Sequence, residues 1–384
     1  MAAHSIIPPS SAGIWGKPNG CTGWVIMSQT YPPRAPHPEA IIGDAVHEVG
    51  AELVQAAGAG NTIGPIKFLG FARDNGTIIN DEMYEGAELY AHDVQSYMRK
   101  YAVFKSDHLG IERRVSAPGI HELSFGTVDA FLYSEKKHRL IIWDFKFGHR
   151  KVEAFENWQG INYAAGIIHE LGLNEYGLVI EIRIVQPRAY HKDGPITSWC
   201  VKAEDLRAHF NTLETNAAIA LGPDATTHTG EHCRDCTARH ACPAALEVGL
   251  DLLEVTGQPI GHELPPDALG LQLEIIIRAR KSLEYLETGF TEQVKALAET
   301  GVNVPGFVIE PTYGRQKWDK PIDEVIALGD MLDKDLRKPT AVTPKQAIAK
   351  GIDADVIAAY STTPRNDDAL VADDLNKAKR IFSL

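Results

Sequence analysis

Two apolar runs separated by a short polar stretch constrain the fold of this chain most strongly. Residues 125–132 and 140–146 have the composition of strands, and the polar residues between them would turn the chain. We therefore expect a hairpin that brings Asp129 close to Asp144. Lys146 follows Asp144 by two residues, so both side chains point the same way from one strand. The sequence thus predicts two carboxylates and one amine at a single place.

Paired carboxylates beside a lysine are the groups that metal-dependent cleavage of a phosphodiester requires. Acids bind divalent cations through hard oxygen ligands, and a lysine stabilises charge near the attacked phosphorus. Because Asp-x-Lys alone is common on surface strands, the flanking residues decide its meaning. Gln159 and Tyr163 follow at the spacing of one helix face. His47 lies upstream, beside the apolar stripe of a predicted helix; a lone histidine at such a place is more often structural.

The order of these residues resembles the RecB-like branch of the PD-(D/E)xK nuclease superfamily. The elements that carry the resemblance are His47, Gly126-Thr127-Val128-Asp129, Asp144-Phe145-Lys146 and Gln159-x-x-x-Tyr163. The resemblance implies an α/β fold with a restriction-endonuclease-like core, in which helices flank a mixed sheet. The chain departs from the family pattern at Asp44, where threonine is more usual. That departure concerns only the start of the helix, because aspartate also suits a first turn.

The same resemblance assigns roles to individual residues. The catalytic set that it implies is Asp129, Asp144, Lys146, Gln159 and Tyr163. The set that it implies for Mg²⁺ or Mn²⁺ is His47, Asp129, Asp144 and the backbone carbonyl of Phe145. Glu112, on the strand expected before Asp129, is an additional candidate ligand.

The cysteines give a second, independent signal. Cys233, Cys236 and Cys242 are spaced as ligands of a soft metal centre, and Cys21 is the candidate fourth ligand. Five cysteines in 384 residues, with no signal peptide, argue against disulfides and for the reducing cytoplasm of a bacterial host. Cys200 reads as a buried strand residue that no centre requires.

The spacing of the thiols leaves the identity of the centre open. RecB-like nucleases with an iron–sulfur staple, including the CRISPR-associated spacer-acquisition nucleases, have one early and three late cysteines. The resemblance therefore implies a [4Fe-4S] cluster. Structural Zn²⁺ is the alternative, because His232 and His240 flank the same cysteines.

Composition and length set the outer limits. The formal net charge of −13 is unusual for a protein whose substrate is polyanionic, but binding to nucleic acid depends on local clusters rather than on the sum. The best cluster is His149-Arg150-Lys151, directly after the Asp-x-Lys strand. No run of eighteen apolar residues occurs, so we expect no membrane span.

Four segments are expected along the chain. They are an irregular N-terminal wrap at 1–38 anchored by Trp15 and Cys21, a nuclease core at 39–229, a cysteine cluster at 230–245 and a mostly helical accessory region at 246–384. The last contains a predicted helix from 268 to about 300 and then Gly314-Arg315 and Lys317-Trp318. A similar start and C-terminal region occur in an uncharacterised family of phage and prophage RecB-like nucleases.

These observations predict a metal-dependent DNA exonuclease that acts in phage or prophage recombination, replication or repair. DNA is the expected partner, with phage recombination or single-strand-binding proteins as further candidates. Two alternatives stay open on the sequence. One is an endonuclease or nickase that uses the same site, and the other is a catalytically silent DNA-binding or assembly protein with the nuclease fold.

Overall fold

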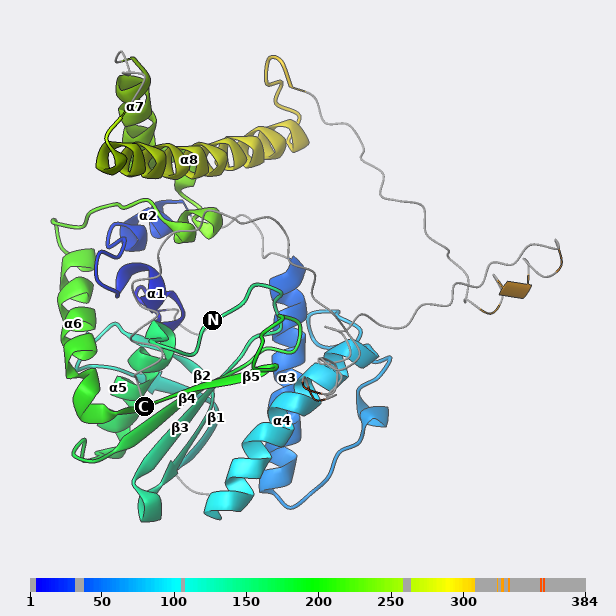
Figure 1. Ribbon diagram of the computed structural model, residues 1–384. Helices are drawn as coiled ribbons and strands as arrows, with labels where there is room; N and C mark the ends of the chain where they lie inside the picture. The colour runs from blue at the N-terminus through cyan, green and yellow to red at the C-terminus, as the bar shows by residue number, and fades with distance from the viewer. Residues whose placement is uncertain are drawn as a thin grey trace. The chain divides into compact units, whose positions relative to one another are not determined.

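A five-stranded mixed sheet lies between two layers of helices (Figure 1). The computed structural model describes residues 5–31, 38–104, 108–257 and 264–307, and six isolated positions beyond them. The strands lie in the order of the sequence: β1 (Leu109–Ser116), β2 (Phe125–Ser134), β3 (Arg139–Phe145), β4 (Val179–Val185) and β5 (Ile196–Lys202). The β3–β4 pair is parallel and the other three pairs are antiparallel. The α/β class predicted from the sequence is confirmed.

The hairpin predicted from the two apolar runs is present as β2 and β3. Ala130 pairs with Trp143 and Ser134 with Arg139, so Glu135–Lys137 form the turn as a short 3-10 helix. Six of the seven residues of β3 are buried, including those on both faces. Such a strand needs cover on both sides, which helices provide here.

Two helical layers cover the sheet (Figure 1). The first contains α3 (Pro38–Gly58) and α4 (Asp81–Tyr101), which pack on Leu132, Trp143 and Phe145. The second contains α5 (Trp158–Leu171) and α6 (Arg207–Leu221), which pack on the alternate residues of the same strands. Because neighbouring residues of a strand point to opposite faces, each strand supplies both cores.

Capping residues fix the ends of the helices nearest to the candidate site. The Asn157 side chain accepts a hydrogen bond from the backbone N–H of Gly160, so α5 begins directly before Gln159. Gly160 itself lies against Ile182 of β4, where an added Cβ would come within 2.7 Å of the isoleucine side chain. The absence of a side chain therefore lets the start of α5 approach the sheet.

A buried polar network joins α4 to the sheet. Arg183 of β4 donates two hydrogen bonds to Asp93 of α4, both 2.8 Å long, and another of 2.6 Å to Glu181. Arg139 of β3 donates to the other oxygen of Glu181 at 2.6 Å. Tyr97 of α4 donates to Glu181 at 2.8 Å. These charges are paired and hydrogen-bonded, as burial requires.

The described N-terminal residues, 5–31, combine short helices with irregular stretches, whereas the sequence predicted an irregular segment throughout. They contain a 3-10 turn at Pro9–Ser11, then α1 (Ala12–Trp15) and α2 (Trp24–Thr30). Trp15 is completely buried in the core with α5 and α6, as predicted. The Trp15 side chain therefore outweighs the local turn residues in fixing this segment.

Two further helices follow the cysteine segment. They are α7 (Pro243–Gly257), which the sequence did not reveal, and α8 (Pro266–Glu299), close to the predicted bounds. The predicted apolar stripe of α8 is only partly buried: Leu286 is 7% exposed, whereas Leu271 is 60% exposed. One compact unit reaches Gly289, and a second begins at Phe290.

The remaining C-terminal predictions, Gly314-Arg315 and Lys317-Trp318, lie outside the described residues. The boundary at 246 stays a prediction. Among the helices that the structure describes, none combines the length and the apolar character needed to span a membrane.

Candidate functional site

The residues predicted from the sequence come together at one end of the central strands. Asp129 lies on β2, Asp144 is the second-last residue of β3, and Lys146 directly follows that strand. The helix α3 brings His47 to Asp129, and α5 brings Gln159 to Asp144. Four elements, β2, β3, α3 and α5, therefore contribute to one site.

His47, Glu112 and Asp129 form a group, called here the His47 group, whose geometry suits a metal ion. His47 Nδ1 lies 3.4 Å from Asp129 Oδ1 and 3.9 Å from Glu112 Oε1. One potential ligand atom from each residue lies within 4.8 Å of the other two, a spacing that no other His, Cys, Asp or Glu cluster among the described residues meets. An imidazole and two carboxylates are ligands that suit Mn²⁺ and Mg²⁺.

The backbone at Glu112 departs from a regular strand. Its φ is +45°, and the ladder between β1 and β2 is interrupted between the pairs Ile111–Ala130 and Arg113–Val128. This interruption places Glu112 opposite Asp129. Two like charges at opposed positions destabilise a sheet, and a left-handed glutamate costs about 1–3 kcal/mol. A cation between the two carboxylates would offset both costs.

The charges inside the His47 group are strongly shifted. Burial by itself would lower the pKa of His47, but the carboxylates of Asp129 and Glu112 raise that pKa to about 10. Burial would raise the pKa of Asp129, but the positive charges of His47 and Lys146 hold it below its usual value. Without a metal ion, the imidazolium of His47 thus compensates the acids.

The two oxygens of Asp144 have different surroundings. Oδ1 lies 2.8 Å from Lys146 Nζ and accepts a hydrogen bond of 2.9 Å from Gln159 Nε2. Lys146 also donates to Gln159 Oε1 at 3.2 Å. Oδ2 is buried and has no hydrogen-bond partner in the described part of the chain. A buried carboxylate oxygen without a partner is costly, and a bound cation would satisfy it.

The charge states of Asp144 and Lys146 are linked. Burial raises the pKa of Asp144, and Lys146 opposes that rise. Burial would lower the pKa of Lys146, but Asp144 and Asp129 raise it. The lysine therefore keeps its charge while lying 2.8 Å from a carboxylate oxygen.

Two predicted residues make contacts of another kind. The hydroxyl of Tyr163 donates to the backbone carbonyl of Thr127 at 2.5 Å, which ties α5 to β2. The backbone N–H of Phe145 donates to Asp129 Oδ2 at 2.6 Å, which fixes that carboxylate. The role predicted for the Phe145 carbonyl stays a prediction.

Asp44 lies well inside α3 rather than at its start, because the helix begins at Pro38.

Sequence reasoning missed Tyr90 of α4, whose ring is buried against that of Phe145. The available signal was its place on the apolar face of α4, where a tyrosine hydroxyl needs a partner.

The four predicted cysteines also come together. Cys21, Cys233, Cys236 and Cys242 are all buried and line one small cavity. Backbone N–H groups of His228 and Gly230 donate to the sulfurs of Cys21 and Cys233 at 3.4 and 3.3 Å. Such hydrogen bonds favour the thiolate form that metals require.

Backbone contacts hold the early cysteine at this place. Gly23 donates to the Thr226 carbonyl at 2.7 Å, and Thr226 donates to the Thr22 hydroxyl at 3.0 Å. Burial, and then the charges of the other cysteines, raise the pKa of Cys233 to about 11. Arg150, which follows β3, pairs with Asp235 and so links the cysteine segment to the end of that strand.

The candidate residues beside the cluster differ in position. His232 lines the cysteine cavity, whereas the His240 ring makes an edge contact with Tyr31. The prediction that Cys200 is buried was wrong. Cys200 is on strand β5 but is exposed, because its neighbour Trp199 takes the inward position.

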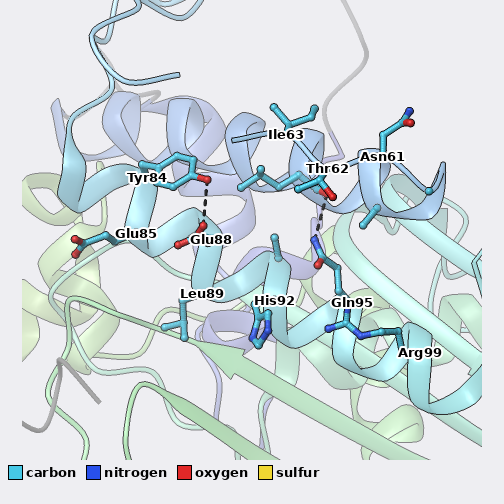
Figure 2. Close-up of a pocket in the computed structure, with 14 residues that line it drawn as sticks. Asn61, Thr62, Ile63, Tyr84, Glu85, Glu88, Leu89, His92, Gln95 and Arg99 are labelled. Carbon is cyan, nitrogen blue, oxygen red and sulfur yellow. Dashed lines mark hydrogen bonds between the residues drawn. The ribbon is translucent and has the colours of Figure 1, made fainter. Parts of the chain in front are cut away.

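A separate pocket lies between the end of α3 and α4. Figure 2 shows Glu88, His92 and Arg99 projecting from α4 along this pocket, and the hydroxyl of Tyr84 donates to Glu88 at 3.1 Å. None of the predicted site residues lines it. We therefore assign it no part in the chemistry of the site.

A model of a known protein family matches most of the chain. Residues 4–348 match the family described as a protein of unknown function, DUF2800. The chain belongs to the DUF2800 family. The match includes both the His47 group and the four buried cysteines.

Proposed function

We propose that this DUF2800 protein is a metal-dependent DNA nuclease of the RecB-like PD-(D/E)xK type. One observation carries the proposal. Asp144 has one oxygen held by Lys146 and Gln159, and its other oxygen is buried and has no hydrogen-bond partner among the residues that the structure describes. This arrangement suits a site in which carboxylates bind a cation and a lysine faces the reacting phosphate.

The donor set fits Mg²⁺ or Mn²⁺. His47, Asp129 and Asp144 would hold the ion, with Glu112 as a further ligand. The bound ion would lower the pKa of a water molecule and neutralise charge on the phosphate. The imidazole favours Mn²⁺ relative to Mg²⁺, since nitrogen-containing sites follow the general affinity order of divalent metals.

The side chains around the ion have separate tasks. Lys146, kept charged by its anionic neighbours, would orient the attacking water and stabilise negative charge on the phosphate oxygens. Gln159 would hold Lys146 and Asp144 in a fixed relation, because it is hydrogen-bonded to both. Tyr163 would set the position of α5 through Thr127 rather than touch the phosphate.

Within this proposal, the cysteines hold a [4Fe-4S] cluster that ties the N-terminal segment to the core. The order of the cysteines, one early and three late, supports this choice, because it resembles that of RecB-like nucleases with an iron–sulfur cluster. Structural Zn²⁺ is the alternative, since thiolates in this spacing can bind either metal.

The mode of cleavage is tested by a time course on linear and circular DNA, single- and double-stranded, with Mg²⁺ or Mn²⁺. An exonuclease consumes only the linear forms. Loss of the circular forms would instead indicate an endonuclease. Binding of DNA without cleavage under all conditions would indicate a silent DNA-binding protein and overturn the proposal.

A further inference from the structure

Tyr90 lies in the middle of α4, and neighbours on two elements fix its ring. The ring stacks on that of Phe145, with centroids 4.8 Å apart and planes within 4°. Another part of the ring lies against Gly50 of α3, where an added Cβ would come within 2.8 Å of Tyr90 Cδ1. Gly50 follows His47 by three residues, so the two share a helix face.

The second neighbour of the ring also belongs to the candidate site. The backbone N–H of Phe145 holds the Asp129 carboxylate, and the ring of Phe145 lies 5.0 Å from that of His47. Tyr90 is thus packed on the two segments that carry His47 and fix Asp129. The hydroxyl of a tyrosine can donate a hydrogen bond.

The hydroxyl of Tyr90 is buried and makes no hydrogen bond to the described residues of the protein. The residue is 1% exposed, and its oxygen has no hydrogen-bond partner within the described ranges of the chain. Leaving a hydroxyl buried and unpaired costs about 1–3 kcal/mol, and a phenylalanine would pack in the same place without that cost. The described part of the chain therefore supplies no partner for this hydroxyl, and a group bound at the site could supply one.

We propose that Tyr90 is a positioning residue of the His47 group, whose hydroxyl donates a hydrogen bond to a water molecule held by the bound cation. This inference rests on the proposed metal site. It adds a contact from α4, an element that supplies no ligand. Partners of this kind orient the ligands of a metal ion, and their removal typically weakens metal binding about 10- to 100-fold.

Tyr90→Phe removes only the hydroxyl and so tests the inference. We expect the metal-free variant to unfold at the same temperature as the wild type or at a higher one, because an unpaired buried group is lost. We expect its Mn²⁺ dissociation constant to rise about tenfold or more, measured from free Mn²⁺ by electron paramagnetic resonance. Tyr84→Phe, on the same helix but paired with Glu88, is the matched control and should leave Mn²⁺ binding unchanged.

The outcomes separate this inference from the proposed function. Wild-type protein that binds no Mn²⁺ would overturn both. Wild-type protein that binds Mn²⁺ while Tyr90→Phe binds it equally well would overturn only the role of Tyr90. A lower unfolding temperature of metal-free Tyr90→Phe would show that the hydroxyl stabilises the fold, and would also overturn that role.

Discussion

At the scale of single residues, the unequal surroundings of the two Asp144 oxygens determine what a substitution should do. Asp144→Ala removes both the contact with Lys146 and the oxygen that faces the proposed ion, so cleavage and metal binding should both be lost. Lys146→Ala removes the amine together with its aliphatic chain but leaves both oxygens of Asp144 in place. It should lower the cleavage rate by about 100-fold or more while Mn²⁺ still binds. Single-turnover cleavage and Mn²⁺ titration measure the two effects.

The control for Lys146 is an ion-paired surface lysine outside the candidate site. Lys67 pairs with Glu52 at 2.7 Å and is half exposed, so Lys67→Ala should leave the cleavage rate nearly unchanged. Full activity of Lys146→Ala would contradict the catalytic role of that residue.

His47 gives metal binding a definite dependence on pH. Its pKa is raised to about 10 in the metal-free protein, so the ring carries a proton at neutral pH. A metal ligand must be neutral, and binding therefore releases that proton. The Mn²⁺ affinity should rise by up to about tenfold per pH unit from pH 6.5 toward 10.

The same shift has the opposite effect on the stability of the metal-free protein. The pKa of His47 is higher in the folded protein than in the unfolded chain, so protonated His47 stabilises the folded protein. This stabilisation is complete below about pH 6.5 and is lost as the pH rises toward 10. His47→Gln should flatten both pH profiles, as measured by Mn²⁺ titration and by thermal unfolding in chelator. A wild-type affinity that does not change with pH would contradict this role of His47.

At the scale of elements, the local sequence pattern predicted the parts with a strong period and missed the contacts between distant segments. The β2–β3 hairpin followed from two apolar runs with a polar turn, and α8 followed from its helical pattern. The exposure of Cys200 and the left-handed backbone of Glu112 did not follow, because each depends on the register of its strand within the folded sheet. The orphaned hydroxyl of Tyr90 likewise depends on packing between α3, α4 and β3.

The polar network of β4 and α4 makes the stability of the sheet dependent on pH. Burial would raise the pKa of Glu181, but hydrogen bonds from Arg139, Tyr97 and Arg183 hold it below its usual value. Because the pKa of Glu181 is lower in the folded protein than in the unfolded chain, ionised Glu181 stabilises the folded protein at pH values above about 4.5. This stabilisation is lost as the pH falls below that value. Glu181→Gln should lower the free energy of unfolding at pH 7 by about 1–3 kcal/mol.

Urea unfolding at pH 7 and pH 4 measures this contribution. The difference between Glu181→Gln and the wild type should shrink at the lower pH. Glu153→Gln, at a surface pair, should change the stability by less than about 1 kcal/mol at either pH. A difference that grows as the pH falls would contradict the assignment.

At the scale of the whole molecule, the cysteines bring an N-terminal segment of the first compact unit together with a segment more than two hundred residues later. Cys21 and Cys233 are 212 positions apart (233 − 21), yet they line one cavity. A centre that joins them closes a very long loop, which removes conformational freedom mainly from the unfolded chain. Its loss should release the N-terminal segment, whose Trp15 lies in the core shared with α5 and α6.

Cys21→Ser therefore tests structure and cofactor together. Protein purified without oxygen should be brown and contain iron and sulfide, whereas the variant should lose colour. Its unfolding should be easier by about 2 kcal/mol or more, which corresponds to a Tm lower by at least about 4 °C. Cys200→Ser is the matched control, because Cys200 is exposed and its sulfur accepts a hydrogen bond from Arg139 of β3. This substitution should change neither the colour nor the unfolding. Colourless wild-type protein with one equivalent of zinc would show that the four cysteines bind zinc instead of an iron–sulfur cluster, still linking the N-terminal segment to the core. Normal metal content in Cys21→Ser would exclude Cys21 as a ligand.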